Sequence, residues 1–342
     1  MQALILAGGR GTRLRPLTES IPKPVLPLAG RPHIAYVIDW LESHGVDHVV
    51  VSCGFLAEGV RKAVDGITGP AVSFATEPEP RGTAGAIRFA ADQLGDRFLV
   101  LNGDVLCDLD LTAMVSQHES TGARATIALY PVDDPTAYGL VRRTGDGAVT
   151  EFVEKPDPAE VDTDEINAGA YFLERSVLDL IQPDVAVSIE REVFPRLVGE
   201  GLYGRRLDGY WMDIGTPDRY LQASWDILEG RVETATGRLV GGDGLLVSDE
   251  AELHPDARLA APAMVEAGTT VGAGASIGPR AVVGPACSIA ENASIAGSAL
   301  LSGCTVGADA SVDGAILSPE AVVVPEAVLK PGAVVGPGER VG

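Results

Sequence analysis

A six-residue period in the C-terminal part of the chain constrains its fold more than any other feature. From Val247 an aliphatic residue recurs every sixth position, except for two steps of five residues that follow Leu301 and Val312. The series is Val247, Leu253, Leu259, Val265, Val271, Ile277, Val283, Ile289, Ile295, Leu301, Val306, Val312, Leu317, Val323, Leu329, Val335 and Val341. Small or polar residues usually follow, which suits tight corners. Such a period predicts short stacked units that each bury one aliphatic side chain.

This pattern resembles the hexapeptide repeat of left-handed β-helices. In that fold each six-residue unit forms one flat side of a triangular coil, and its aliphatic side chain points inward. The resemblance implies a left-handed β-helix over residues 247–342. Glycines and charges before it predict a linker at 230–246.

Residues 1–229 have a different pattern, in which short apolar runs alternate with amphipathic segments. It predicts strands at 3–6, 48–52, 72–75, 98–101 and 125–129, and helices at 34–44, 57–65, 84–93 and 112–120. Alternation of this kind is typical of an α/β domain with a mixed, mostly parallel, Rossmann-like sheet. Residues 138–213 are expected to form a lid-like second half over that sheet.

Bulk composition bounds the class of protein. A chain of 342 residues that is 46% hydrophobic can bury a substantial core. The N-terminus has no charged stretch followed by an apolar run, and we find no run of roughly 18 apolar residues, so we expect a cytoplasmic protein. Its cysteines show neither CxxC spacing nor neighbouring histidines, which favours reduced thiols over a zinc site or disulfides.

The charge of the chain changes sign near the N-terminus. A net charge of −22 opposes nucleic acids and anionic membranes, so neither is an expected partner. The first 31 residues nevertheless carry five basic residues and one acid, a net charge of +4. This segment can therefore receive an anionic ligand.

The basic segment contains the strongest chemical motif, an apolar strand that runs into Gly8-Gly9-Arg10-Gly11-Thr12-Arg13. Glycines let backbone N–H groups approach a phosphate or a base, and arginine suits phosphoryl oxygens. A dinucleotide fingerprint would need glycine in place of Leu14, and the Gly-Lys-Ser/Thr of a Walker A loop is absent. The simpler alternative, a glycine turn with surface arginines, does not account for Lys23 and Pro24.

These residues resemble the signature of the sugar nucleotidyltransferases, GG-x-GTRL-x-PLT followed by Lys-Pro. Further matches follow in the family's order: 79–85 (EPRGTAG), 101–104 (LNGD), 138–139 (YG), 152–156 (FVEKP), 167–169 (NAG) and 210–215 (YWMDIG). The resemblance covers the whole chain. Within the family, 188–195 (SIEREVFP) and 211–215 (WMDIG) look most like mannose-1-phosphate guanylyltransferases.

The resemblance implies roles for residues in catalysis, in metal binding and in binding of the two substrates. Arg13 and Lys23 would be catalytic, neutralising phosphoryl charge. Asp104 and Asp213 would hold Mg²⁺ through carboxylate oxygens. The nucleotide would contact Leu6, Ala7, Gly8, Gly9, Gly11, Thr12, Glu79, Gly82, Thr83 and Asn102. The sugar phosphate would contact Tyr138, Gly139, Glu154, Lys155, Asn167 and Gly169.

The chemistry of the reaction agrees with these residue types. A sugar 1-phosphate has a second pKa near ~6, so its nucleophilic oxygen is already ionised at neutral pH and needs no general base. All five histidines of the chain lie outside the motifs. Charge neutralisation and in-line positioning are what the reaction requires.

Several alternatives stay open. Gly82-Thr83-Ala84 and Trp211-Met212-Asp213 favour guanine over thymine or uracil without deciding the base, so a glucose-1-phosphate thymidylyltransferase or another sugar nucleotidyltransferase is the alternative. A non-catalytic regulatory subunit of the same fold and a purely structural β-helix protein belong to other classes. Acyl transfer by the β-helix is disfavoured because His254 is its sole histidine. The expected partners are the small-molecule substrates and, from the resemblance, further copies of this chain in a homo-oligomer.

Overall fold

The computed structural model of the chain describes residues 1–54 and 56–342. Contacts group the chain into two compact units, Met1–Gly9 with Val37–Trp211 and Arg10–Tyr36 with Met212–Gly342. The boundaries at 229 and 246 that the sequence indicates remain a prediction. In the described part of the chain, no helix has the length and apolar character needed to cross a membrane.

The first unit is built on a nine-stranded mixed sheet in the order β10-β9-β11-β6-β1-β4-β5, with β8 and β12 continuing from β11. Its strands are β1 (Gln2–Leu6), β4 (His48–Cys53), β5 (Ala71–Thr76), β6 (Arg97–Asn102), β8 (Ala125–Pro131), β9 (Gly139–Arg143), β10 (Val149–Glu154), β11 (Glu165–Glu174) and β12 (Leu202–Arg206). The helices include α1 (His33–Ser43), α2 (Ala57–Val64), α3 (Gly82–Phe89), α4 (Leu111–Thr121) and the short α5 (Phe194–Leu197).

The sheet is parallel from β6 through β1 and β4 to β5 and antiparallel around β11. Strands β1 and β4 are apolar runs because a central parallel strand is buried on both faces. Helix α4 begins where the Asp110 carboxylate accepts from the N–H of Ala113, and ends at Gly122 with φ 62°. The five strands and four helices indicated by the sequence are confirmed with small shifts of their ends.

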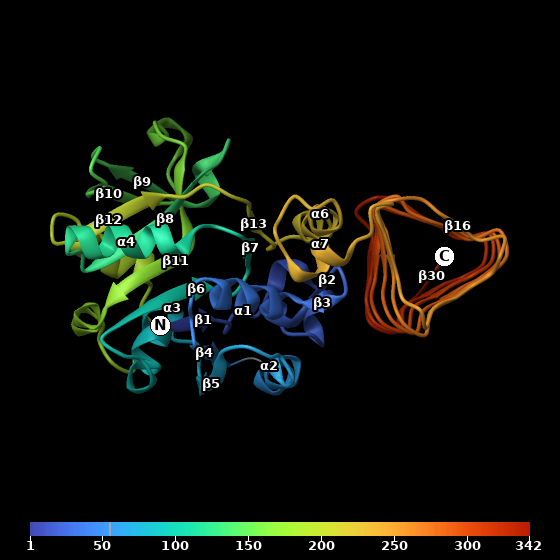
Figure 1. Ribbon diagram of the computed structural model, residues 1–342, viewed down its shortest axis with the longest axis horizontal. Helices are drawn as coiled ribbons and strands as arrows, with labels where there is room; N and C mark the ends of the chain where they lie inside the picture. Colours follow the sequence, from blue (N-terminus) through green and yellow to red (C-terminus); the bar gives the residue numbers. More distant parts are fainter. Residues whose placement is uncertain (55) are drawn as a thin grey trace. The chain divides into compact units, whose positions relative to one another are not determined.

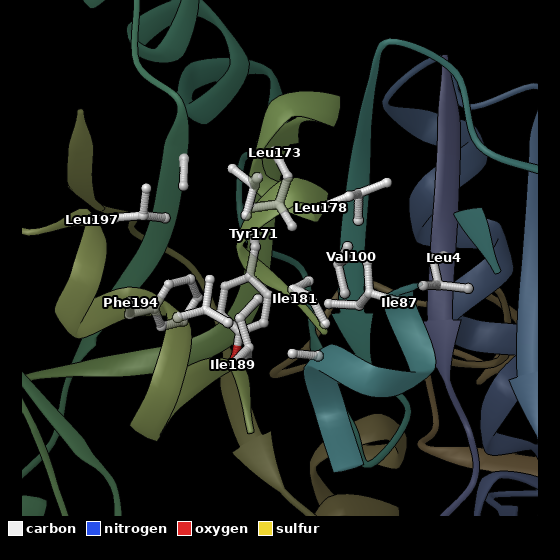
Figure 2. Close-up of a cluster of buried hydrophobic side chains, with 14 of the residues drawn as sticks. Leu4, Ile87, Val100, Tyr171, Leu173, Leu178, Ile181, Ile189, Phe194 and Leu197 are labelled. Carbon is white, nitrogen blue, oxygen red and sulfur yellow. The ribbon is translucent and has the colours of Figure 1, made fainter. Parts of the chain in front are cut away.

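The expectation of a lid-like half over 138–213 is wrong for β11. This ten-residue strand pairs with β6 and β8 and is almost wholly buried, so it is a central strand of the sheet itself. Its apolar residues alternate with polar ones only near its start, at Glu165 and Asn167. Figure 2 shows Tyr171 of this strand facing Phe194, whose ring centroid lies 5.0 Å away, in the core of the first unit.

The second unit contains the left-handed β-helix that the hexapeptide period predicts, seen end-on as a triangle in Figure 1. One side comprises β14 (Leu245–Val247), β17 (Ala263–Val265), β20 (Ala281–Val283), β23 (Ala299–Leu300), β26 (Ile316–Leu317) and β29 (Val334–Val335). The second comprises β15 (Glu252–Leu253), β18 (Thr270–Val271), β21 (Ser288–Ile289), β24 (Thr305–Val306), β27 (Val322–Val323) and β30 (Arg340–Val341). The third comprises β16 (Arg258–Leu259), β19 (Ser276–Ile277), β22 (Ser294–Ala296), β25 (Ser311–Asp313) and β28 (Val328–Leu329).

One inward position differs from the series. Leu300, which is fully buried, belongs to the core of the coil, whereas Leu301 does not. The first five-residue step therefore lies between Ile295 and Leu300. Two adjacent leucines leave the register open in the sequence, and strand pairing of Leu300 with Val283 and Leu317 decides it.

The rest of the second unit consists of the segment Arg10–Tyr36 and the helices α6 (Pro217–Leu228) and α7 (Ala235–Leu239). Two short strands, β2 (Pro27–Leu28) and β3 (Arg31–Pro32), pair antiparallel within that segment. The hydroxyl of Tyr220 on α6 donates to the carbonyl of Pro27, and Tyr36 bonds to Leu28 and to Thr236 of α7. These bonds attach the basic segment to the two helices.

Candidate functional site

A glycine turn follows β1 at the carboxyl edge of the parallel sheet. The N–H of Ala7 donates to the carbonyl of Ser52 (2.8 Å), which continues the strand pairing by one residue. Gly8 is half-buried and Gly9 exposed, and a Cβ on Gly9 would meet no atom within 4 Å. The backbone of this turn is therefore open to a ligand, at the edge where α/β sheets bind them.

A buried carboxylate lies beneath the glycine turn. Glu77 is 7% exposed and follows the end of β5, and its Oε1 lies 3.4 Å from where a Cβ of Gly8 would stand. Ser52 Oγ donates to Oε1 (2.6 Å) and the N–H of Arg81 donates to Oε2 (3.2 Å). The sequence indicates the exposed Glu79 as a nucleotide contact and does not indicate Glu77. Its position just after an apolar strand is the signal that could have found it.

The start of α3 is fixed to the segment 187–190. Gly82 has φ 68°, and a Cβ there would come within 2.6 Å of the Val187 carbonyl, so only glycine fits. The Thr83 hydroxyl donates to Glu190 Oε2 (2.8 Å) and accepts from the N–H of Ile189 (2.8 Å). Thr83 thus orders this loop, and its contact with a nucleotide remains a prediction.

Asn102 and Asp104 lie where β6 turns into β7 (Val105–Cys107). Gly103, between them, packs so closely on β1 that a Cβ would lie 2.6 Å from the Leu6 carbonyl. This close packing holds Asn102 and the half-buried Asp104 beside the end of β1. Both residues lie at the carboxyl end of β6, and their contacts with a nucleotide or a metal remain predictions.

Asn102 also borders a second group of predicted residues. Gly169 has φ 77°, and a Cβ there would lie 2.8 Å from Asn102 Nδ2. Asn167 donates through Nδ2 to the Tyr171 hydroxyl (2.9 Å), and its Oδ1 accepts from the N–H of Gly169 (2.9 Å). Burial and the charge of Glu190 raise the pKa of Tyr171. The structure therefore brings Asn102, Asn167 and Gly169 together around a buried, neutral phenol.

Glu154 and Gly139 face one another across β10 and β9. A Cβ on Gly139 would lie 3.2 Å from Glu154 Oε2, so glycine leaves room for that carboxylate. Burial, and then the charge of Glu190, raise the pKa of Glu154, while Lys155 opposes this shift. Lys155 is exposed, has φ 55°, and its N–H donates to the Tyr138 carbonyl (2.9 Å).

An aromatic group closes one side of these strands. The ring of Trp211 stacks on Tyr130 at 5.7 Å between centroids and meets Tyr138 edge-on at 5.3 Å. Its indole N–H donates to the Ala168 carbonyl (2.8 Å). Trp211 thereby supports Tyr138 and the backbone that precedes Gly169.

The second unit holds Arg13 and Asp213 against one glycine. Arg13 Nη2 and Asp213 Oδ1 each lie 2.7 Å from where a Cβ on Gly215 would stand. Arg219 Nη1 lies 3.4 Å from Asp213 Oδ2. Arg219, in the first turn of α6, was not singled out from the sequence, and its place six residues after Asp213 is the only signal. Asp213 thus lies among cationic side chains.

Gly11 fixes the turn that carries Arg13. It has φ 59°, and a Cβ there would lie 2.9 Å from Thr18 Cγ2 and 3.2 Å from Lys23 Cβ. The Thr18 hydroxyl donates to the Gly11 carbonyl (2.8 Å), and Lys23 is only 7% exposed. Thr12 and Arg13 are exposed at the start of a 3₁₀ turn. The buried Lys23 and the exposed Arg13 therefore both belong to the short segment that Gly11 orders.

Comparisons with known proteins match both parts of the chain. Residues 2–230 match the family model described as nucleotidyl transferase, and residues 259–342 match the GMPPB C-terminal domain. The mannose-1-phosphate guanylyltransferase of Mycobacterium tuberculosis is 39% identical over 266 residues, which cover 76% of this chain and 73% of that protein. The mannose-1-phosphate guanylyltransferase catalytic subunit beta of Danio rerio is 39% identical over 72% of this chain and 70% of its own length.

Two solved structures also align with the chain. HddC from Yersinia pseudotuberculosis aligns with a TM-score of 0.58 and 31% identity, covering 65% of this chain and 97% of that one. A further crystal structure of HddC, complexed with GMP-PN, aligns with a TM-score of 0.56 and 32% identity over the same shares. With the family model matching well over half of the chain, the protein belongs to the nucleotidyl transferase family.

Proposed function

We propose that this protein transfers a guanylyl group from GTP to mannose 1-phosphate, giving GDP-mannose and pyrophosphate with the help of Mg²⁺. The named activity of relatives from a bacterium and a fish supports this reaction. Both parts of the chain match family models, which supports an activity shared with these relatives rather than a similar fold with another function. The proposal includes the residue roles set out from the sequence and adds Glu77.

The observation that carries the guanine assignment is the buried carboxylate of Glu77 beneath Gly8. Guanine presents two neighbouring donors, its ring N–H and its exocyclic NH₂, whereas the other bases present acceptors next to their donors. A carboxylate has about four lone-pair sites, and among residues 1–54 and 56–342 one hydrogen bond reaches each oxygen of Glu77. Glu77 is therefore proposed to accept from guanine, with Leu6, Ala7, Gly8 and Gly9 contributing backbone.

The sugar phosphate is assigned to the group around Glu154. Glu154 and Asn167 can bond sugar hydroxyls, and the glycines at 139 and 169 leave room for a ring against the main chain. Tyr138 would border the ring, and the exposed ammonium of Lys155 would receive the phosphate. The raised pKa of Glu154 suits an acceptor surrounded by hydroxyl groups better than one paired with a cation.

Charge neutralisation is assigned to the basic segment. Arg13 and Lys23 would stabilise the α-phosphate and the departing pyrophosphate, and the ionised sugar phosphate needs no base to attack. The carboxylates of Asp104 and Asp213 have the hard oxygen donors that Mg²⁺ prefers. When bound, Mg²⁺ would neutralise charge that develops on the phosphates.

Pyrophosphate release from the full chain tests this function. Purified protein with Mg²⁺ is assayed with GTP, dTTP, UTP, ATP and CTP against mannose, glucose, N-acetylglucosamine and heptose 1-phosphates. We expect one dominant signal, for GTP with mannose 1-phosphate. Dominance of another pair, such as dTTP with glucose 1-phosphate, would keep the reaction and overturn the substrates, and silence throughout would favour a non-catalytic subunit.

A further inference from the structure

A cavity of about 240 Å³ lies within the second unit, and neither Arg13 nor Asp213 lines it. Three elements form its walls: the basic segment, helix α6 and the first side of the β-helix. The lining residues that matter below are Pro27 and Gly30, Tyr220, and Glu266, Ala299 and Leu301. All belong to one compact unit.

The β-helix contributes an outward apolar column to this cavity. Met264, Val282 and Ala299 pair in register on successive turns of the β-helix. They lie outside its interior core. They are nevertheless buried, at 8%, 6% and 2% exposure. The register step at Leu300 adds Leu301 to the same wall. An apolar face that would otherwise meet water is thus covered on the outside of the coil.

A single carboxylate interrupts the apolar wall. Glu266 Oε1 lies 2.9 Å from where a Cβ on Gly30 would stand. Over residues 1–54 and 56–342 no hydrogen bond or ion pair reaches this carboxylate, and burial raises its pKa to about 7. The nearby Tyr220 hydroxyl already donates to Pro27, so it does not donate to Glu266.

This combination selects the chemistry of a ligand. Removing a carboxylate from water without a partner is costly, and a donor supplied from outside would recover that cost. The apolar walls favour a hydrocarbon body, and the carboxylate disfavours an anionic group. An apolar cavity of about 150 Å³ in another protein holds benzene, so the present one can hold a ring with one substituent.

We propose that this cavity is a binding site for a small organic cation, whose apolar body packs against Val282, Ala299 and Leu301 and whose ammonium donates to Glu266. The site uses none of the residues assigned to nucleotidyl transfer. The inference therefore stands or falls independently of the proposed function.

Binding of benzylammonium to the full chain tests the proposal, measured by calorimetry at about pH 8, where Glu266 is ionised. We expect saturable binding with a Kd of about 1 mM or tighter. Glu266→Gln should weaken it at least about tenfold, because a hydrogen bond to a charged acceptor is lost. Neutral benzyl alcohol should bind more weakly than benzylammonium and respond less to that substitution.

Two further variants separate the cavity from general effects. Glu291→Gln, at an exposed corner of the same coil, should leave binding unchanged, and Ala299→Leu should abolish it by filling the space. Thermal unfolding checks that each variant is folded, and if Ala299→Leu is not, the two glutamate variants decide. Equal affinity in wild type and Glu266→Gln, or no saturable binding up to about 10 mM, overturns the proposal.

Discussion

Asp213 lies beside Arg13 and Arg219, and the side chains of Arg13 and Asp213 fill the space where a Cβ on Gly215 would stand. Its side chain is 15% exposed, so its charge interacts strongly with groups around it. These contacts hold the carboxylate in one orientation, which a metal ligand or a partner of a catalytic arginine requires.

We predict that Asp213→Asn and Asp104→Asn each lower Mg²⁺-dependent kcat at least about a hundredfold, because each removes charge stabilisation in the transition state. The thermal transition of the ligand-free protein should change little. Steady-state pyrophosphate release checks this, with Asp218→Asn on the exposed side of α6 as the matched control. Full activity in either variant would remove that residue from the metal site.

Glu77 and Glu79 provide a matched pair for base recognition. The buried Glu77 places its Oε1 beneath Gly8, whereas Glu79 is exposed. We predict that Glu77→Gln lowers kcat/KM for GTP about a hundredfold, since one acceptor of guanine's two donors is lost, while Glu79→Gln changes it less than threefold or so. Competition between GTP and the other nucleotides measures the effect, with circular dichroism checking that Glu77→Gln is folded. A loss confined to Glu79→Gln would return base recognition to the residue indicated by the sequence.

Elements of secondary structure show where sequence patterns are sufficient. The apolar runs that form β1, β4 and β6 predict these strands because nothing polar interrupts them. The hexapeptide series predicts the β-helix because an aliphatic residue recurs at the inward position of each six-residue unit. Helix α6 was missed, although Thr216-Pro217 is a helix-start signal. The meeting of Glu77 with Gly8 could not be predicted, since it depends on which strands become neighbours.

The register step in the coil gives a test at the scale of an element. Leu300 points into the core and Leu301 lines a cavity outside it. We predict that Leu300→Ala lowers the free energy of unfolding by about 3 kcal/mol and Leu301→Ala by about 1 kcal/mol, because an existing cavity wall loses fewer contacts. Urea denaturation of both variants measures the difference. A larger loss for Leu301→Ala than for Leu300→Ala would support the register indicated by the sequence, in which Leu301 points inward.

At the scale of the whole molecule, segments far apart in the sequence build one unit around the outward face of the coil. The basic segment and α6 cover the column of Met264, Val282 and Ala299, and Gly30 lies against Glu266. A hexapeptide period identifies inward residues but gives no information on which outward face will be covered. Glu266 therefore reads as an ordinary corner residue until the packing is known.

The partly buried position of Glu266 makes stability depend on pH. Its pKa is raised from 4.5 to about 7 by burial, so between these values the unfolded chain loses its proton first and the folded state becomes less stable as pH rises. Two other titratable groups interact with Glu266. Tyr220 has a raised pKa and stays neutral. Cys287 is replaced by serine (Cys287→Ser) in the parent protein, so that its thiol does not contribute to the pH dependence.

In that background, Glu266→Gln should raise the free energy of unfolding by about 1–2 kcal/mol near pH 8, after allowance for solvent at the cavity mouth, and change it little near pH 5. Urea denaturation at the two pH values measures this, and Glu291→Gln is the control because its exposed carboxylate keeps the same surroundings on unfolding. An equal gain at both pH values would mean that the amide packs better than the carboxyl group. A loss near pH 8 would mean that Glu266 has a cationic partner, and the cavity would then offer no acceptor to a ligand.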